Sequence, residues 1–155
     1  EAIRIHPQFV AAWYNRALTF LERKDYYPVV RDLGKCIELE PETVAYHVDM
    51  AKVQITLMEY GNAHKEFSEA IRLNPQNPEL LLFRGHTNAQ QHALEEAVAD
   101  YQAALRLDPS FVKCRAYLAA TLFHLNRKDE ACAEFKRAGE EGEETAQKFW
   151  EAHCK

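Results

Sequence analysis

The sequence is poor in glycine and proline, with 5 and 6 among its 155 residues. So few residues of these types argue against long β-meanders and against disordered linkers. Long hydrophobic runs are missing too, since no apolar stretch approaches the roughly 20 residues that a membrane-spanning helix needs. The first residues show no signal peptide. We therefore expect a folded protein without membrane insertion. Because the sequence opens at Glu1 without an initiator Met, we also expect it to be part of a larger, multi-repeat protein.

Positive charge is not in excess, because the formal net charge is -5. A protein that binds the nucleic-acid backbone usually carries a basic field, so this balance argues against a nucleic-acid partner. Glycine-rich phosphate loops are missing, and none of the 7 histidines sits in a recognisable metal or triad motif. We expect no catalytic residue, no metal site and no cofactor in this chain.

The four cysteines form no Cys-x-x-Cys pair and have no paired histidines beside them, which argues against a zinc site. A disulfide framework is unexpected in a chain with 47% hydrophobic residues, because such frameworks serve small domains that cannot build a sufficient core. We therefore predict free thiols in a reducing compartment, which means a cytoplasmic location. The four residues are Cys36, Cys114, Cys132 and Cys154.

What the sequence does contain is an internal repeat. Prolines recur every 34 residues, and each follows a phrase of the same type, such as Ile37-Glu38-Leu39-Glu40-Pro41. A period of this length is typical of arrays in which each repeat is one small structural unit. The prolines that mark the period are Pro7, Pro41, Pro75 and Pro109.

Between the prolines, apolar residues follow a helical period. In the first repeat, the spacing of Trp13, Ala17 and Phe20 places them on one face of a helix. A second run of this kind follows the polar break at residues 23–25. Short polar breaks suit the turns of antiparallel helix pairs. The spacing therefore predicts two amphipathic helices per repeat.

Two columns of small residues run through the repeats. Small side chains are needed where the two helices of a hairpin cross closely. One column consists of Ala17, Ala51, Gly85 and Ala119, and the other of Cys36, Ala70, Ala104 and Ala138. Together with the recurrent proline and the 34-residue period, these columns resemble the tetratricopeptide repeat.

The resemblance implies an all-α fold, a right-handed α-solenoid of helix-turn-helix repeats. Residues 1–9 are similar to the end of a preceding repeat's second helix. One column departs from the family pattern, because it begins with Trp13 but continues as His47, Leu81 and Arg115. The resemblance assigns four repeats to residues 10–43, 44–77, 78–111 and 112–142, and a C-terminal capping helix to residues 143–155.

The last segment differs from the repeats. Residues 139–142 interrupt the array, and Glu143 stands where the next repeat proline would fall. A stack of repeats leaves an apolar face open at each end, so a cap is expected there. Phe149 and Trp150 lie at helical spacing within this segment and are the candidates for the cap. The alternative is that these two rings anchor a partner.

In the tetratricopeptide family, the first helix of each hairpin lines the concave face of the solenoid. The resemblance therefore implies a groove of mixed aromatic, aliphatic and polar residues, which suits an extended peptide or a partner helix. The alternative for Asn15 is a solvated surface position, and the alternative for Phe83 and Tyr117 is packing between hairpins. The candidate contact residues are Tyr14, Asn15, Leu18, Asp49, Lys52, Phe83, His86, Lys113 and Tyr117.

Some members of the family hold the C-terminal carboxylate of a chaperone with Lys, Asn and Arg from three repeats. In the corresponding columns of this sequence Lys113 has the required charge, whereas Asp49 and Glu79 are acidic. We therefore predict a protein-interaction module, a scaffold or adaptor, that binds a peptide or partner helix but does not clamp a carboxylate tail. The alternatives are a docking or regulatory segment of a larger enzyme, and a spacer whose groove is empty.

Overall fold

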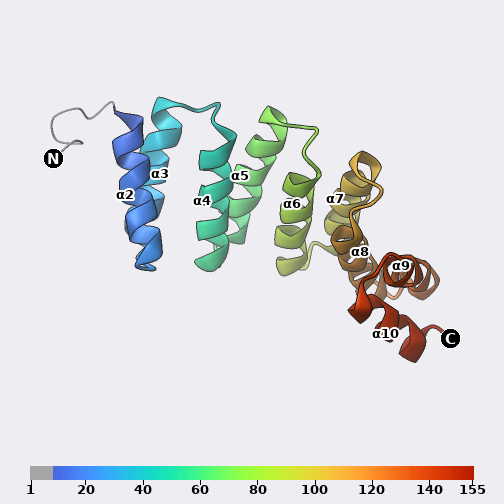
Figure 1. Ribbon diagram of the computed structural model, residues 1–155. Helices are drawn as coiled ribbons and strands as arrows, with labels where there is room; N and C mark the ends of the chain where they lie inside the picture. Colours follow the sequence, from blue (N-terminus) through green and yellow to red (C-terminus); the bar gives the residue numbers. More distant parts are fainter. Residues whose placement is uncertain (1–8) are drawn as a thin grey trace. The chain divides into compact units, whose positions relative to one another are not determined.

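The computed structural model describes residues 9–155, and these form nine helices and no strand (Figure 1). This all-helical repeat solenoid confirms the predicted fold class. The expected end of a preceding repeat helix, residues 1–9, lies outside the described residues except for Phe9. The helices are α2 (Val10–Glu22), α3 (Tyr26–Leu39), α4 (Val44–Thr56), α5 (Tyr60–Leu73), α6 (Pro78–Gln90), α7 (Leu94–Leu107), α8 (Val112–His124), α9 (Lys128–Glu140) and α10 (Glu144–His153).

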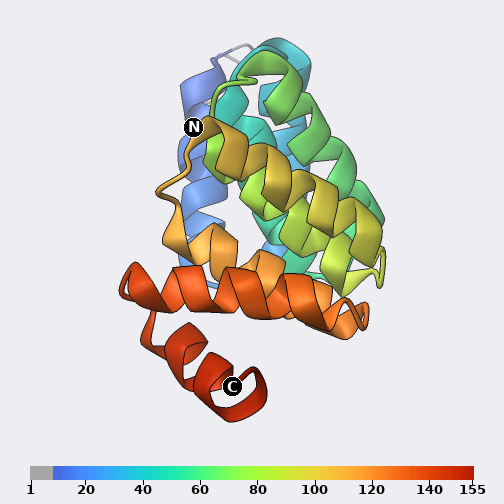
Figure 2. The same ribbon diagram turned by 90° about the vertical axis from the view of Figure 1, so that its right-hand side faces the viewer.

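The chain divides into two compact units, one that ends at Pro75 and one that begins at Gln76. In the N-terminal unit, α2 pairs with α3, α4 pairs with α5, and α3 contacts α4. In the C-terminal unit, α6 pairs with α7, α8 pairs with α9, and α7 contacts α8. Figure 2 shows α9 lengthwise, with α10, which packs on it, leading to the C-terminus. Each repeat is therefore a hairpin of two neighbouring helices.

Each hairpin turns through one residue in the left-handed helical region. In every turn a backbone N–H just beyond this residue reaches back into the helix that has ended. In the second hairpin, for example, the Glu59 N–H donates to the Gln54 carbonyl at 2.8 Å. Such bonds satisfy carbonyls that a helix end leaves open, so the short polar breaks become tight turns. The left-handed residues are Lys24, Met58, His92 and Asn126, with φ between 57° and 61°.

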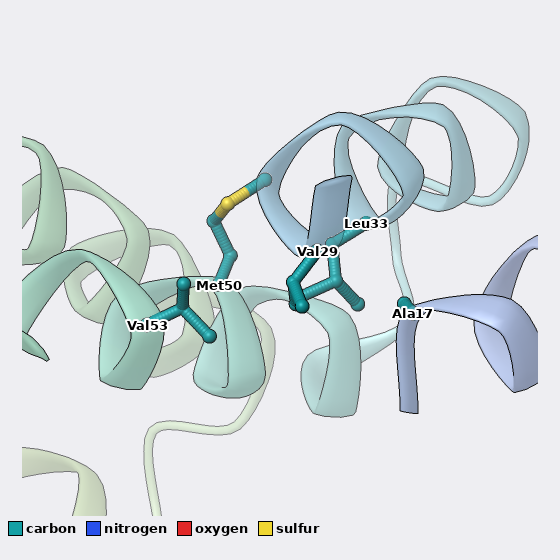
Figure 3. Close-up of a cluster of buried hydrophobic side chains, with 5 residues drawn as sticks. All are labelled: Ala17, Val29, Leu33, Met50 and Val53. Atoms are coloured by element: carbon teal, nitrogen blue, oxygen red, sulfur yellow. The ribbon is translucent and has the colours of Figure 1, made fainter. Parts of the chain in front are cut away.

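The core of the N-terminal unit lies where its two hairpins meet (Figure 3). Burying one Val, Leu or Met side chain contributes about 1.5–3 kcal/mol. The cluster takes residues from both hairpins, so each hairpin is stabilised by its neighbour, as expected of repeats that cannot bury their apolar faces alone. It contains Ala17 of α2, Val29 and Leu33 of α3, and Met50 and Val53 of α4, all 5% exposed or less.

Gly85 lies in one of the columns of small residues, where two helices cross. A Cβ at this position would come within 2.7 Å of Tyr101 Cε1, and Tyr101 is itself 1% exposed. Gly34 on α3 is different, because a Cβ there would meet Met50 Cε at 3.9 Å, an ordinary contact. The packing therefore requires a residue without a side chain at Gly85 but not at Gly34.

Gly85→Ala is expected to destabilise the protein by about 1–3 kcal/mol, because the added methyl group overpacks a buried ring. Gly34→Ala is the matched control and should stabilise the protein by about 0.5–1 kcal/mol, because alanine is the better helix former. Urea denaturation followed by circular dichroism measures both changes. If the two substitutions shift stability in the same direction, the close approach at Gly85 is not what selects glycine there.

The first and third hairpins each contain an ion pair whose carboxylate is buried. Arg16 Nε lies 2.6 Å from Asp32 Oδ2, and Arg84 Nη2 lies 2.5 Å from Asp100 Oδ1. Asp32 and Asp100 are 0% and 5% exposed, so each carboxylate depends on its arginine for charge compensation. Burial raises the pKa of Asp32, but hydrogen bonds from Arg16 and Arg31 outweigh it, and the net pKa is lowered.

In the second and fourth hairpins, Glu66 and Glu134 occupy the column that holds Asp32 and Asp100 in the other two hairpins. His47 Nδ1 lies 2.7 Å from Glu66, and its Nε2 lies 2.9 Å from the Pro41 carbonyl. Arg115 repeats this arrangement, at 3.1 Å from Glu134 and 2.5 Å from the carbonyl of the equivalent proline. The replacement of tryptophan by His47 and Arg115, in the column that begins with Trp13, thus has a structural reason. His47 and Arg115 connect the acidic column to the loop that precedes their hairpin.

Cys132 on α9 and Cys154 at the end of α10 form a disulfide, with Cα atoms 5.6 Å apart. The prediction of four free thiols is therefore wrong for this pair. It is confirmed for Cys36 and Cys114, which are free and buried. No motif marks a separation of 22 residues. The pair comes within disulfide reach because α10 packs back along α9.

Candidate functional site

A groove of about 940 Å³ lies in the C-terminal unit between α8 and α10. Most side chains that line it are apolar or aromatic, and its charged residues stand near the ends of the helices. Concave sites with such a lining commonly bind ligands or peptide segments. The lining includes Val112, Ala116, Tyr117, Ala120 and Phe123 from α8, Phe135 from α9, and Thr145, Ala146 and Phe149 from α10.

The wall formed by α8 is recessed because it carries small residues on one stripe. Ala116 and Ala120 are four residues apart, so they lie one turn above the other on the same face of the helix. Lys113 and Tyr117 repeat this spacing beside them. The short alanine side chains leave space beside Lys113 and Tyr117, and this space is part of the groove.

Phe149 belongs to the opposite wall and also joins α10 to the last hairpin. Its ring stacks on Phe135 of α9 with 4.3 Å between centroids, and it meets Phe123 of α8 edge-on at 5.0 Å. Aromatic pairs in such arrangements contribute about 0.5–1.5 kcal/mol beyond the burial of their area. Phe149 therefore has contacts that a capping residue requires, and it borders the groove at the same time.

Trp150, the second candidate for the cap, has a more solvated environment. It is half-buried, and the ammonium groups of Lys136 and Lys155 lie 5.8 and 5.2 Å from its ring centroid. Cation–π contacts at exposed sites are worth about 0.5–1 kcal/mol. Trp150 should therefore hold α10 less firmly than Phe149. The capping role stays a prediction for both residues.

Both glutamates that line the groove are engaged by neighbours in the same unit. Glu141 accepts a hydrogen bond from Arg115 at 2.9 Å. Glu143 caps the start of α10 by accepting from the Ala146 N–H at 2.5 Å. Lys113, at the start of α8, is exposed and can meet a bound segment directly. The charges at the groove thus partly neutralise one another, and the apolar lining dominates its chemistry.

The structure gathers some candidate contact residues of the C-terminal unit around Tyr117. Lys113 and Tyr117 both line the groove. The His86 ring of α6 lies 5.7 Å from the Tyr117 ring, and Tyr101 of α7 stacks on Tyr117 at 6.2 Å. Tyr117 therefore packs against the neighbouring hairpin and borders the groove as well. Phe83 is half-buried on α6.

In the N-terminal unit, the structure brings Tyr14 and Asp49 together. The Tyr14 hydroxyl donates to Asp49 Oδ2 at 2.7 Å, and its ring lies 5.1 Å from that of Tyr46. Burial, followed by the hydrogen bond to Asp49, raises the pKa of Tyr14 to about 12. The two polar groups satisfy each other, which leaves them less hydrogen-bonding capacity for a partner. The remaining candidates, Asn15, Leu18 and Lys52, are exposed on α2 and α4.

Several residues that line the groove lie outside the predicted contact set. Phe123 and Phe135 come from the last hairpin, and Thr145 and Ala146 come from α10. Thr145 and Phe149 are four residues apart, as on one helical stripe. This spacing is the signal in the sequence that marks a second wall, because it gives the terminal helix a face of its own.

A smaller hollow of about 460 Å³ lies beside Trp13 in the N-terminal unit. It contains Arg16 and Arg31, which would suit an anionic ligand. Both arginines already bind Asp32, at 2.6 and 3.1 Å. The Arg16 guanidinium also lies over the Trp13 ring, 4.9 Å from its centroid. The larger groove is therefore the better candidate for a binding site.

The sequence profile of the tetratricopeptide repeat matches residues 48–110 and 95–143. The chain belongs to the tetratricopeptide repeat family. The match covers more than half of the sequence, and it confirms the resemblance on which the repeat assignment rests. The tetratricopeptide fold is generally a non-catalytic interaction module. No helix within residues 9–155 combines the length and the hydrophobicity that a bilayer crossing requires.

Named relatives share the tetratricopeptide repeat over part of their length. E3 ubiquitin-protein ligase CHIP of Arabidopsis thaliana is 36% identical over 73 residues, which are 47% of this chain and 26% of that protein. Hsp70-Hsp90 organizing protein 3 of Arabidopsis thaliana is 34% identical over 81 residues, which are 52% of this chain and 14% of that protein. The chain thus spans about a quarter or less of these relatives.

Solved structures show the same tetratricopeptide fold. The crystal structure of MamA matches with a TM-score of 0.85 at 18% identity, over 94% of this chain and 85% of that chain. The first tetratricopeptide domain of Spaghetti (RPAP3), bound to the HSP90 peptide SRMEEVD, matches with a TM-score of 0.69 at 19% identity, over 77% of this chain and 94% of that chain. At these identities the likeness concerns the fold alone.

Proposed function

We propose that this chain is a protein-interaction module, a scaffold or adaptor, whose groove between α8 and α10 binds an apolar segment of a partner protein. The observation that carries the proposal is an apolar groove of about 940 Å³ in a tetratricopeptide fold. Protein segments bind such grooves by burying apolar side chains, while a few polar groups fix their orientation. The space beside Ala116 and Ala120 suits one or two large apolar side chains of the partner.

The lining favours a protein segment over a phosphate or a nucleic acid. Ala116, Ala120 and Phe149 offer apolar contact, and Glu143, which accepts from a backbone N–H, adds a negative charge that would repel an anion. The net charge of -5 also provides no basic field for a nucleic-acid backbone. An apolar peptide, or the apolar face of a partner helix, agrees best with this chemistry.

A chaperone tail is the competing ligand, because relatives include an Hsp70-Hsp90 organizing protein. A carboxylate is held strongly where several cationic donors converge on it. Of the columns that such a clamp would use, one holds Lys113, whereas Asp49 is bonded to Tyr14 and Glu79 is exposed at the start of α6. We therefore propose that this chain does not clamp a free carboxylate.

A second candidate function is a docking or regulatory segment of a larger enzyme. It is favoured by the partial coverage of relatives such as a ubiquitin-protein ligase, of which the chain spans 26%. The groove would then hold a substrate or a regulator of the enzyme. A cytoplasmic location also stays a proposal. There, reducing conditions would act on the bond between Cys132 and Cys154.

Selection of random displayed peptides on the immobilised protein tests the groove. Ala120→Trp fills its middle, and Ala99→Trp is the matched control, because Ala99 is exposed on α7. Peptides selected on the wild type should bind Ala120→Trp at least about tenfold more weakly, a loss of about 1.4 kcal/mol, and should bind Ala99→Trp unchanged. Calorimetric titration measures the affinities, and circular dichroism checks that both variants fold.

The peptide SRMEEVD serves as the chaperone control in the same titrations. Its free-acid and amidated forms should bind equally weakly. If the selected peptides bind Ala120→Trp as well as they bind the wild type, their site lies outside the groove. Tight binding of the free acid that amidation abolishes would establish the carboxylate clamp.

A further inference from the structure

α10 packs on α9 but is a short helix with little buried surface of its own. It contains 10 residues, of which Ala146 is buried, and helices this short are marginal in water unless packing supports them. Phe149 contacts rings of both α8 and α9, and His153 lies 6.3 Å from the Phe123 ring of α8. The opposite end is fixed covalently, because Cys154 is the C-cap of α10 and is bonded to Cys132 of α9. One wall of the groove is therefore held both by packing and by a disulfide.

The bonded cysteines differ from the other two in their access to solvent. Cys132 and Cys154 are half-buried, so this pair is partly open to solvent. Cys36 and Cys114 are 0% exposed, and burial raises the pKa of their thiols to about 11 and about 12. Because the thiolate is the reacting species, these two thiols are inert. Exchange is thus confined to one pair of cysteines.

We propose that the bond between Cys132 and Cys154 is a reversible redox latch that keeps α10 docked on α9. The oxidant is a low-molecular-weight disulfide such as oxidised glutathione. One cysteine thiolate attacks this disulfide and expels a thiolate, and the second cysteine then displaces the other thiolate from the mixed disulfide. Two protein thiols are oxidised, and the two electrons and two protons end in two molecules of the small thiol. A reduced dithiol reverses the step.

Reduction loosens α10 while the preceding hairpin keeps its own contacts. α8 and α9 pack on each other independently of the bond. The bond joins residues 22 apart, and a link over such a loop restricts the open state of the chain. Its loss should raise the open population of α10 about a hundredfold. An open α10 removes Thr145 and Phe149 from the groove. The effect on partner binding rests on the proposed function, whereas the effect on α10 does not.

The fluorescence of Trp150 can report whether α10 is docked, because Trp150 lies on α10. The chain has 2 tryptophans, so Trp13→Phe leaves Trp150 as the sole source of tryptophan emission. Deuterium exchange of the α10 amides and acrylamide quenching of Trp150 are measured in oxidised glutathione, after reduction by dithiothreitol, and after reoxidation. On reduction we expect exchange in α10 to become about a hundredfold faster and quenching to increase, with exchange in α6 and α7 unchanged. Reoxidation should restore the slow exchange.

Two variants sharpen the test. The double substitution Cys132→Ser and Cys154→Ser should exchange rapidly in α10 under both conditions. In Gly139→Ala, the added Cβ would lie 2.9 Å from Gln147 Cα, so α10 should be pushed from α9 and exchange faster even with the bond intact.

Exchange in α10 that differs by less than about twofold between the oxidised and reduced protein would overturn the latch. So would thiols that fail to re-form the bond. The groove and the latch can also fail separately. If exchange in α10 responds to reduction but the groove binds no selected peptide, the proposed function is refuted and the latch still holds.

Discussion

Replacing Arg84 by Leu is expected to destabilise the C-terminal unit by about 3–5 kcal/mol. Arg84 donates to Asp100 from Nε at 3.0 Å and from Nη2 at 2.5 Å, and Asp100 is 5% exposed. Without the guanidinium, the carboxylate keeps the amide of Asn88, at 2.9 Å, but loses the positive charge that compensates its own. A buried charge without a counter-charge is among the most destabilising changes that one substitution can cause.

Urea denaturation followed by circular dichroism measures this loss, and deuterium exchange should place it in α6 and α7. Arg72→Leu is the control, because Arg72 and Glu69 form an exposed pair at 2.7 Å in the N-terminal unit. Its effect should be small, because exposed ion pairs are screened by solvent. Adding Asp100→Leu to Arg84→Leu should recover much of the stability, because the uncompensated charge is then gone. A loss at Arg84 no larger than that at Arg72 would mean that Asp100 reaches water once the arginine is absent.

The hairpins could be predicted because each repeat meets the same packing requirement at the same position. Ala17 and Ala119 are 1% and 0% exposed where their helices cross, and a small residue is needed there in every repeat. The conformation of the turns was harder to predict. Met58 and His92 have φ of 61°, although methionine has no preference for the left-handed region. Packing of the two helices imposes this conformation at a cost, so local preferences do not reveal it.

The column that begins with Trp13 shows where a comparison of single columns fails. His47 and Arg115 depart from the family pattern, and no position beside them in the sequence explains the change. Their partners, Glu66 and Glu134, each lie 19 residues further along the chain. The departures become intelligible when the two columns are considered together, because His47 and Arg115 then each lie within hydrogen-bond distance of the acid that faces them across the hairpin.

Part of the groove follows from helical periodicity. Lys113 and Tyr117 are four residues apart on α8, and both line it, as residues of one stripe should. The opposite wall could not be derived from that stripe. The course of α10 depends on the turn at Gly142, with φ of 103°, and on the close approach at Gly139. The disulfide, and the place of Phe149 beside the groove, follow from the same turn.

Phe149→Ala is the second substitution with a large expected effect, a loss of about 1.5–4 kcal/mol in the docking of α10. The loss combines about 1.5–3 kcal/mol of burial with about 0.5–1.5 kcal/mol from the ring contacts to Phe123 and Phe135, reduced because the side chain is only half-buried. Trp150→Ala is the matched control. Its contacts to two lysines should cost about 1–2 kcal/mol together, at about 0.5–1 kcal/mol for each exposed cation–π contact.

The measurement is best made on the reduced protein, because the bond between Cys132 and Cys154 would otherwise keep α10 near α9 and mask the loss. Deuterium exchange of α10 and the midpoint of thermal unfolding should both change more for Phe149→Ala than for Trp150→Ala. An exposed Phe135 should also make the first variant associate at high concentration, through the apolar face that α10 covers. This experiment separates the two roles that the sequence leaves open for the terminal aromatic residues. If Phe149→Ala leaves exchange and unfolding unchanged but weakens the binding of groove-selected peptides, the ring anchors a partner and does not act as a cap.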